Sequence, residues 1–239
     1  MIRTATPADR DALYALWAAC FNAAHVVPLY ETDPGRYGRT FVTEDVSACV
    51  YYLPRRIRDG SGGSVLVGGV ANVAAHPSVR GRGYVRELLE FAVEAMRADG
   101  CAWSLLFTGT PGVYKRWTPF DLQTVSGPLA TPSSTSLRSV PVSDPWLRQV
   151  HERYNATRPL STVRDDEHWR LRVPLWYTDV LANDAGYAAV RWSDELEVLE
   201  VAGDVPAVLS GLATEAAARG VTRGRARLAW DEPGLPYLF

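Results

Sequence analysis

One pattern of apolar residues occurs twice in the chain, at an offset of 120 residues. In both places the residues recur at i, i+3, i+4, i+7, i+8 and i+11, which is the spacing of a helix with one apolar face. The two sets are Val85, Leu88, Leu89, Ala92, Val93 and Met96 in the first half, and Val205, Val208, Leu209, Leu212, Ala213 and Ala216 in the second. Gly100 and Gly220 follow at the same offset and predict the end of each helix. Segments with strand composition flank each helix, so we interpret the chain as two copies of one strand–helix–strand unit.

The repeat indicates two domains in a chain of 239 residues. Extended segments precede both helices and predict two hairpins, formed by residues 46–58 with 65–75 and by residues 187–192 with 196–202. Prolines among serines and threonines mark residues 126–145 as the boundary region. We therefore expect a first domain over 1–127, a linker over 128–143 and a second domain over 144–239. The expected class is α+β, with a mixed, mostly antiparallel central sheet flanked by helices in each half.

Composition and charge exclude several other classes. The net charge is −2, so nothing indicates binding to nucleic acid, and no apolar run of about 18 residues predicts a membrane span. Charged residues near the N-terminus interrupt any signal sequence, so we expect a cytoplasmic protein. Cys20, Cys49 and Cys101 are too widely spaced for a disulfide framework or a zinc site, and no metal is expected. Of the 25 basic residues only Lys115 is a lysine, which indicates a GC-rich, bacterial genome.

The two halves differ in the connection from strand to helix. In the second half Gly203 and Asp204 alone make this connection, whereas the first half inserts residues 76–84, with two glycines and two arginines. Free N–H groups and the helix dipole favour an anion at a helix start, and glycines let the backbone approach it closely. Arginines add charge-assisted hydrogen bonds. The insertion therefore predicts a pyrophosphate site, although it matches neither of the common nucleotide-binding loops.

Residues 70–89 resemble the acetyl-CoA motif of the GCN5-related N-acetyltransferase (GNAT) superfamily, [Q/R]-x-x-G-x-[G/A]. Arg80 and Gly83 take the first two fixed positions, and Val85 stands where the family has a small residue. Residues 111–120 resemble the Y-x-x-x-G-F segment of the same family, with Tyr114 as its tyrosine and Thr118-Pro119 in place of the glycine.

An intact GNAT domain followed by a degenerate one is similar to the enhanced intracellular survival protein group, and so is the segment from Val163 to Arg170. The resemblance implies tandem GNAT folds, the second copy being degenerate. Members of that group usually carry a further sterol-carrier-like domain, for which we see no room in this length. The resemblance leaves self-association into a homo-oligomer open.

The resemblance also implies an activity, N-acetyl transfer from acetyl-CoA to a primary amine of a small molecule. Its implied cofactor-binding residues are Val73, Ala74 and Ala75 for the pantetheine arm and Arg80, Gly81, Arg82, Gly83, Tyr84 and Val85 for the pyrophosphate. An N–H near Ala74 would polarise the acetyl carbonyl. Tyr114 would protonate the departing thiolate, and a phenol with a pKa near ~10 suits that task. The terminal carboxylate of Phe239 is the implied general base.

Without the resemblance, the sequence does not identify a carboxylate or histidine as the general base. His25 lies in the loop after the first helix, where acceptors bind in this fold. Near it in sequence are four acidic residues, Glu31, Asp33, Glu44 and Asp45. We interpret each of the five as a solvent-exposed loop residue. Two alternatives remain open at this level. The chain could be a non-catalytic acyl-CoA-binding sensor or interaction module, or it could transfer another acyl group, or act on peptide N-termini or lysines.

Overall fold

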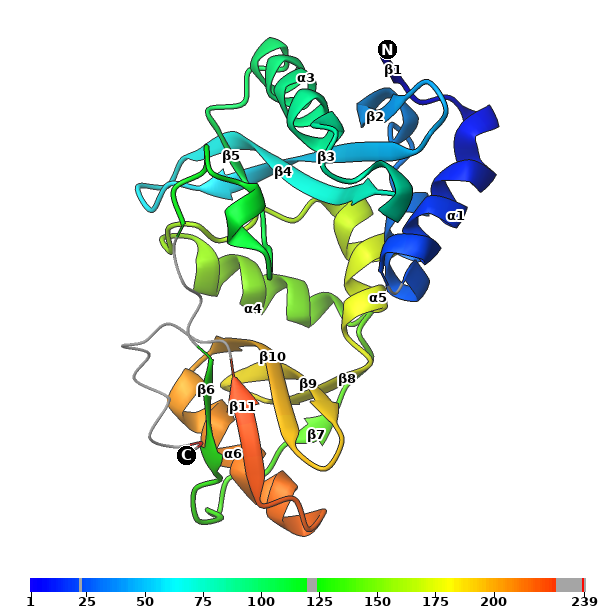
Figure 1. The fold of residues 1–239 in the computed structure, drawn as a ribbon. Helices are drawn as coiled ribbons and strands as arrows, with labels where there is room; N and C mark the ends of the chain where they lie inside the picture. The colour runs from blue at the N-terminus through cyan, green and yellow to red at the C-terminus, as the bar shows by residue number, and fades with distance from the viewer. Residues whose placement is uncertain (22, 120–123, 227–237, 239) are drawn as a thin grey trace. The chain divides into compact units, whose positions relative to one another are not determined.

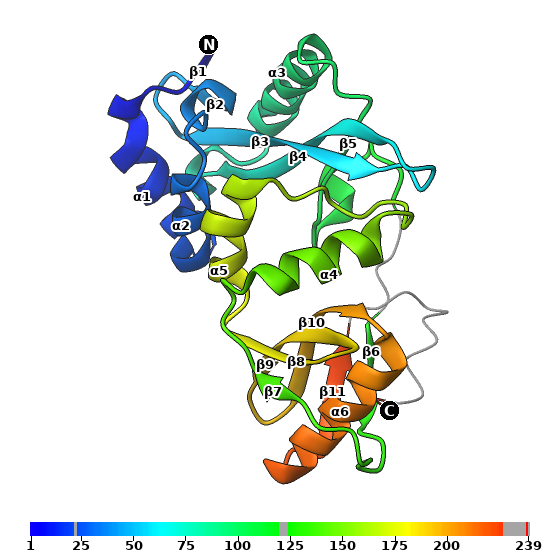
Figure 2. The same cartoon turned by 180° about the vertical axis from the view of Figure 1, so that it is seen from behind.

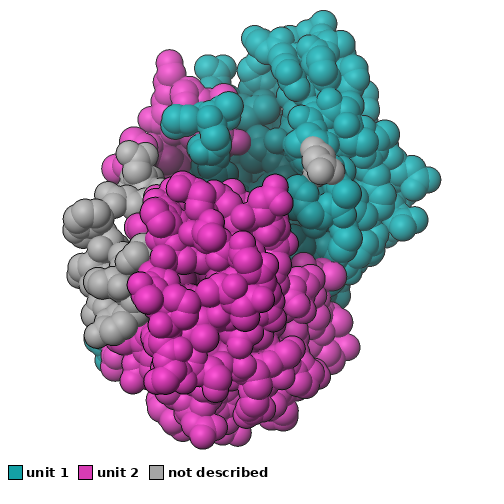
Figure 3. All heavy atoms as spheres, turned by 90° about the horizontal axis from the view of Figure 1, so that it is seen from below, with its two compact units in different colours: residues 1–111, 159–163 teal, residues 112–158, 164–239 magenta. Residues whose placement is uncertain are grey.

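The computed structural model describes residues 1–239 except 22, 120–123, 227–237 and 239. The chain divides into two compact units (Figure 3). The first comprises Met1–Pro111 and Pro159–Val163, and the second comprises Gly112–Arg158 and Arg164–Phe239. The chain therefore returns to the first unit after it has begun the second. The domain limits expected from the sequence, 1–127 and 144–239, stay a prediction, and these units begin and end elsewhere.

The first unit is built on a five-stranded sheet in the order β1-β2-β3-β4-β5 (Figure 1). The strands are β1 (Ile2–Thr4), β2 (Thr40–Thr43), β3 (Ala48–Arg58), β4 (Ser64–Ala75) and β5 (Trp103–Leu105). Its helices are α1 (Arg10–Cys20), α2 (Val26–Glu31) and α3 (Tyr84–Ala98), with short 3₁₀ turns η1 (Pro7–Asp9), η2 (Ala23–His25), η3 (Tyr37–Arg39) and η4 (Pro77–Val79). Neighbouring strands are antiparallel except β4 and β5, which run parallel. The predicted hairpin is confirmed as β3 and β4.

Strand β4 changes character along its length. Between the pairs Tyr51–Ala71 and Cys49–Ala74 it holds one more residue than β3, which is a β-bulge. Asn72 lies in this bulge with φ of 49°, a left-handed conformation that asparagine tolerates better than most residues. Strand β5 pairs only with residues 67–69 of β4. Beyond that point no described strand covers the β5-facing edge of β4.

Helix α3 confirms the first predicted apolar face. Leu88, Leu89, Ala92 and Met96 are buried, while Val85 and Val93 are half-buried. The Met96 side chain packs against Gly68 of β4. A side chain at position 68 would collide with Met96, so glycine makes this contact possible. Gly100 has φ of 77° and follows the helix where the sequence predicts its end. Because α3 packs on the sheet, its N-terminus is held close to the end of β4.

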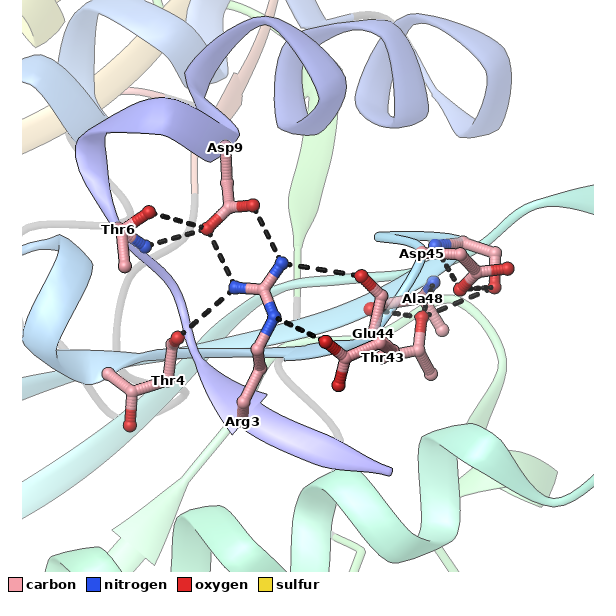
Figure 4. Close-up of polar contacts among 9 residues, drawn as sticks. Arg3, Thr4, Thr6, Asp9, Thr43, Glu44, Asp45 and Ala48 are labelled. Carbon is pink, nitrogen blue, oxygen red and sulfur yellow. Dashed lines mark hydrogen bonds and ion pairs between the residues drawn. The ribbon is translucent and has the colours of Figure 1, made fainter.

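A charged network joins the start of the chain to the first helical turn (Figure 4). The guanidinium of Arg3 donates to both carboxylate oxygens of Asp9, at 2.8 Å each. Asp9 also accepts the backbone N–H and the hydroxyl of Thr6, at 2.8 and 3.0 Å, which completes a capping box. Arg3 reaches the backbone carbonyl of Glu44 at 3.3 Å, so β1, η1 and the turn after β2 are held together.

The second unit contains a six-stranded sheet in the order β6-β11-β10-β9-β8-β7 (Figure 2). Its strands are β6 (Val125–Pro128), β7 (Arg138–Ser139), β8 (Asp179–Asn183), β9 (Gly186–Trp192), β10 (Leu196–Gly203) and β11 (Arg223–Ala226). Its helices are α4 (Pro145–Asn155), the π-helical turn η6 (His168–Arg172), α5 (Val173–Trp176) and α6 (Val205–Ala218), and η5 (Pro111–Val113) stands at the unit boundary. Helix α6 packs with one apolar face of the sheet and α4 with the other. The sequence did not predict α4, β7 or β8.

The predicted repeat of strand, helix and strand is present in both units. In each, a helix connects two parallel strands, β4 to β5 through α3 and β10 to β11 through α6. Strand β10 also carries a bulge, between Val198 and Glu200. Across the part of the chain that the structure describes, every helix is too short or too polar to cross a membrane.

Candidate active site

The turn after β4 is stabilised from within. His76 caps η4, with its ring nitrogen Nδ1 accepting the backbone N–H of Ser78 at 3.3 Å and lying 2.7 Å from the Ser78 hydroxyl. Arg80 turns back toward the strand, and its Nε donates to the carbonyl of Ala75 at 3.2 Å. One of the two loop arginines therefore ties the loop to the strand end, a role that the sequence did not indicate.

The start of α3 presents unused donors. Gly81 and Gly83 have φ of 79° and 88°, in the left-handed region where glycine avoids the cost that a side chain imposes. Gly83 is the N-cap, and its carbonyl accepts the N–H of Arg86 and Glu87 at 3.0 and 3.2 Å. The N–H groups of Gly83, Tyr84 and Val85 donate to no residue that the structure describes. Unused N–H groups at a helix start, together with the helix dipole, favour an anion at this position.

The exposed edge of β4 leads directly into this position. The N–H of His76 donates to the carbonyl of Ser47 at 2.8 Å, on the β3 side. Because backbone groups alternate along a strand, Ala74 also faces β3, and the N–H and carbonyl of Ala75 face the opposite edge. The carbonyl of Ala75 accepts from Arg80 and, at 3.3 Å, from the thiol of Cys20. Of the expected cofactor-binding residues, the structure thus brings Arg80 against Ala75 at the end of β4.

A second thiol lies beneath the bulge. Cys49 is buried, donates to the carbonyl of Asn72 at 3.3 Å and accepts the indole N–H of Trp17 at 3.2 Å. Burial raises the pKa of the Cys49 thiol to about 12. A thiol in this state is not a nucleophile at neutral pH, so Cys49 supports the bulge rather than the chemistry.

Tyr114 lies in the second unit, directly after η5. Its half-buried ring meets Trp117 edge-on, with 6.2 Å between the ring centroids. Burial raises the pKa of the Tyr114 phenol, so it is protonated at neutral pH, as a general acid must be. Phe120, near the aromatic position of the Y-x-x-x-G-F segment, and Phe239, whose carboxylate is the implied base, lie outside the described residues.

The interpretation of Asp33 as a solvent-exposed loop residue is wrong. Asp33 is 3% exposed and accepts the hydroxyl of Tyr51 at 2.5 Å, the guanidinium of Arg39 and the N–H of Gly35 at 3.0 Å. Burial opposes ionisation of Asp33, but the hydrogen bonds from Tyr51 and Arg39 outweigh it and lower the pKa of this carboxyl. A fully bonded, ionised carboxylate is a poor base, and Asp33 instead anchors the segment after α2.

The remaining acidic candidates also have partners. Glu31 is held by Arg36 at 2.8 Å, by Arg10 at 3.3 Å and by the Tyr14 hydroxyl. Asp45 accepts from Ser47 within its own turn, and Glu44 lies exposed beside Arg3 (Figure 4). His25 is exposed at the end of η2 and contacts no hydrogen-bonding partner among the described residues. Of these five side chains, His25 is therefore the one without a hydrogen bond or ion pair to a described residue.

The sequence analysis missed a buried charged cluster in the second unit. Arg164 pairs with both carboxylate oxygens of Glu200 and donates to the hydroxyl of Tyr177 at 2.9 Å. Tyr187 donates to the same carboxylate at 2.6 Å. Arg164 and Glu200 are far apart in the sequence, and β10 places Glu200 just after its bulge, so no local pattern signals the pair.

Comparison with known proteins agrees with this geometry. Residues 1–118 match the family model of the acetyltransferase (GNAT) domain. This segment contains the open edge of β4 and the loop before α3, so both features lie in the part of the chain that is similar to the GNAT acetyltransferase domain. No curated protein sequence matches the chain.

Solved structures match the fold over the whole chain. A GCN5-related N-acetyltransferase from Kribbella flavida aligns with 100% of this chain and 66% of its own, at a TM-score of 0.75 and 18% identity. Eis1 from Mycobacterium abscessus aligns with 100% and 68%, at a TM-score of 0.70 and 16% identity. A GCN5-related N-acetyltransferase from Anabaena variabilis aligns with 100% and 68%, at a TM-score of 0.75 and 15% identity. The chain spans about two thirds of the length of these structures, and at such identities they show the fold alone.

Proposed function

We propose that the chain is an N-acetyltransferase that uses acetyl-CoA and acetylates a primary amine of a small molecule. The observation that carries the proposal is the open edge of β4, which runs into a helix start with three unused N–H groups. The GNAT family match over residues 1–118 supports it. The tandem arrangement, with a second unit that has lost its phosphate loop, belongs to the same proposal.

The residues present fit acetyl-CoA. The N–H groups of Gly83, Tyr84 and Val85 suit the pyrophosphate, and exposed Arg82 adds positive charge beside them. The backbone of Val73–Ala75 offers a strand edge to the two amides of the pantetheine arm. When bound, acetyl-CoA supplies an activated acyl group as a thioester.

Each protein group then has one task in the transfer. As the neutral amine forms the new C–N bond and the C–S bond breaks, the N–H of Ala75 on the open edge stabilises the negative charge that develops on the carbonyl oxygen. From the sequence we expect an N–H near Ala74 in this role. We assign the role to the N–H of Ala75, because the backbone N–H of Ala74 points toward β3. The Tyr114 hydroxyl donates its proton to the departing thiolate. The proton released by nitrogen passes to a base, for which the terminal carboxylate of Phe239 stays the proposal.

The direct test is release of thiol from acetyl-CoA over a panel of amines. Tyr114→Phe should lower kcat by about 100-fold, because a general acid contributes a factor of about 10²–10⁴, and it should leave the affinity for CoA unchanged. Trp117→Phe, which keeps an aromatic contact for Tyr114, is the matched control and should retain most of the activity.

Binding of CoA without turnover on any amine would instead favour the non-catalytic acyl-CoA-binding module. Equal rates for wild type and Tyr114→Phe would remove Tyr114 from the mechanism. Propionyl-CoA and peptide acceptors, run in the same assay, separate acetyl transfer to small amines from the other acyl-transfer reactions.

A further inference from the structure

A cavity of about 660 Å³ opens in the second unit. Its wall combines residues of β9, β10 and β11 with residues of α5 and of the segment before η6, all within that unit. This volume lies in the range of about 300–1,000 Å³ that is usual for small-molecule sites. Its lining includes charged and apolar side chains, among them Arg191, Glu197, Arg225, Trp176, Val173 and Leu199.

The floor of the cavity carries an excess of positive charge. Arg191 and Arg225 flank Glu197 on the two neighbouring strands, as the strand register requires. Both guanidinium groups bind the same carboxylate oxygen, Oε2 of Glu197, at 2.9 and 3.1 Å. Both arginine side chains are about half exposed, at 54% and 50%, so they keep donors that face solvent. One carboxylate between two guanidinium groups leaves a net charge of about one positive unit.

Among the lining residues that the structure describes, Arg164 adds nothing to this excess of charge. Arg164 is paired with Glu200 through two hydrogen bonds, so this pair is neutral. Within the described lining, the excess therefore lies at Arg191 and Arg225. A cationic amine would be repelled there, whereas an anion could bridge the two guanidinium groups.

An apolar wall stands beside the charged floor. Val173, Trp176 and Leu199 line the cavity, and the indole of Trp176 is 49% exposed. An exposed tryptophan face at a cavity offers a stacking surface for a ring. Leu199 occupies the bulge of β10, so the irregularity of that strand helps to shape the cavity.

The helix that follows β10 cannot take a phosphate as α3 could. Asp204 alone separates β10 from α6, and its carboxylate caps the helix by accepting the N–H of Ala207 at 3.2 Å. A phosphate at this helix start would meet that negative charge. The chemistry of the second unit thus differs from that of a nucleotide site.

We propose that this cavity binds a small organic carboxylate with an apolar ring. The carboxylate lies between Arg191 and Arg225, and the ring packs on Trp176. This binding requires neither acetyl-CoA nor Tyr114, so it is independent of the proposed acetyl transfer.

The test uses 4-nitrobenzoate as the probe and the full chain without acetyl-CoA, with calorimetry as the readout. We expect saturable binding at one site per chain, and binding of the matched cation 4-nitrobenzylamine at least about tenfold weaker. Arg191→Gln and Arg225→Gln should each weaken binding of 4-nitrobenzoate by about tenfold, since each removes a charge-assisted contact. Arg138→Gln on β7, also an exposed arginine of this sheet, is the control and should leave the affinity unchanged.

Glu197→Gln gives the sharpest result, because it releases both guanidinium groups from their shared partner. It should tighten binding several-fold, an outcome that misfolding cannot produce. Trp176→Ala should weaken binding of 4-nitrobenzoate.

The proposal is overturned if the amine binds as well as the carboxylate, if the arginine variants bind normally, or if Glu197→Gln weakens binding. Displacement of 4-nitrobenzoate by an equal concentration of inorganic phosphate would also overturn it, by making the site one for phosphate. A chain that acetylates amines but does not bind 4-nitrobenzoate would refute this proposal and leave the proposed function intact.

Discussion

Position 83 requires glycine because of its backbone conformation and not because of a lack of space for a side chain. Its φ is 88°, and an added side chain would meet only the end of Arg86 at an ordinary 3.7 Å. Gly83→Ala should therefore lower the free energy of unfolding by about 1–2 kcal/mol, the cost of a left-handed alanine. Because the substitution also shifts the N–H groups of Tyr84 and Val85, the affinity for CoA should fall. Thermal melts and CoA titration measure the two effects.

Gly109→Ala is the matched control for this substitution. Gly109 has no positive φ, and a methyl group added there would meet no atom within 4 Å, so both stability and CoA affinity should be unchanged. A Gly83→Ala protein that binds CoA as tightly as the wild type would show that the helix start does not hold the pyrophosphate.

Asp9 predicts an acid-dependent loss of stability (Figure 4). Hydrogen bonds from Arg3, followed by that of the Thr6 backbone, lower the pKa of Asp9 despite its burial. The folded-state pKa lies below the unfolded value of about 3.9, so the stabilisation is complete above that value and is lost as the pH falls through the folded pKa. Asp9→Asn should cost about 2 kcal/mol at pH 7, and the difference from wild type should shrink below about pH 4.

Urea unfolding at several pH values measures this dependence. Glu44→Gln serves as the control, because Glu44 is 68% exposed and lies 3.9 Å from Arg3, where an ion pair contributes little. A difference between wild type and Asp9→Asn that does not change with pH would assign the effect to packing rather than to charge.

At the scale of elements, the bulge of β4 lies in the part of the strand whose β5-facing edge is open. Asn72 holds the left-handed conformation of the bulge. Asn72→Val should cost about 1–2 kcal/mol, because a β-branched residue is strained there, and should slow acyl transfer by disturbing Val73–Ala75. Asn72→Gly, which accepts the same φ, should keep the acyl-transfer rate near that of wild type. Equal transfer rates in both variants would show that the bulge has no part in the site.

The sequence predicted the elements whose pattern is local. The helices at α3 and α6, their terminal glycines and the β3–β4 hairpin follow from spacing and turn residues within short segments. The glycine-rich turn into the start of α3 was also predictable, because strand, glycines and helix are contiguous, and the pyrophosphate site there stays a prediction. Helix α4 was missed, since its segment begins at the end of the proline-rich stretch 126–145 that we interpreted as the boundary region.

Contacts between distant residues could not be predicted in this way. Asp33 is buried because Tyr51 and Arg39 reach it from β3 and η3, and neither contact is visible from its own loop. The pairing of Arg164 with Glu200 similarly depends on how the segment before η6 meets β10 in the folded unit. Residue-level roles in the candidate site therefore required the fold.

At the scale of the whole molecule, the first unit is completed by a segment from beyond α4. Residues 159–163 bond to the end of β3, with Arg58 N–H to Ser161 carbonyl at 2.8 Å and Leu160 N–H to Arg58 carbonyl at 2.9 Å. A fragment of residues 1–127 lacks these bonds, each of which contributes about 1 kcal/mol. We expect this fragment to melt at a lower temperature than the first unit in the full chain. Equal melting temperatures would show that residues 1–127 form an independent domain.

The proposed acetyl transfer requires that CoA binds along β4 and at the start of α3. The most direct measurement is a crystal structure of the full chain with CoA. The account predicts pyrophosphate oxygens within hydrogen-bonding distance of the N–H groups of Gly83, Tyr84 and Val85, and the pantetheine arm along Val73–Ala75. A pyrophosphate bound anywhere else, or a CoA that leaves the edge of β4 uncovered, would contradict it.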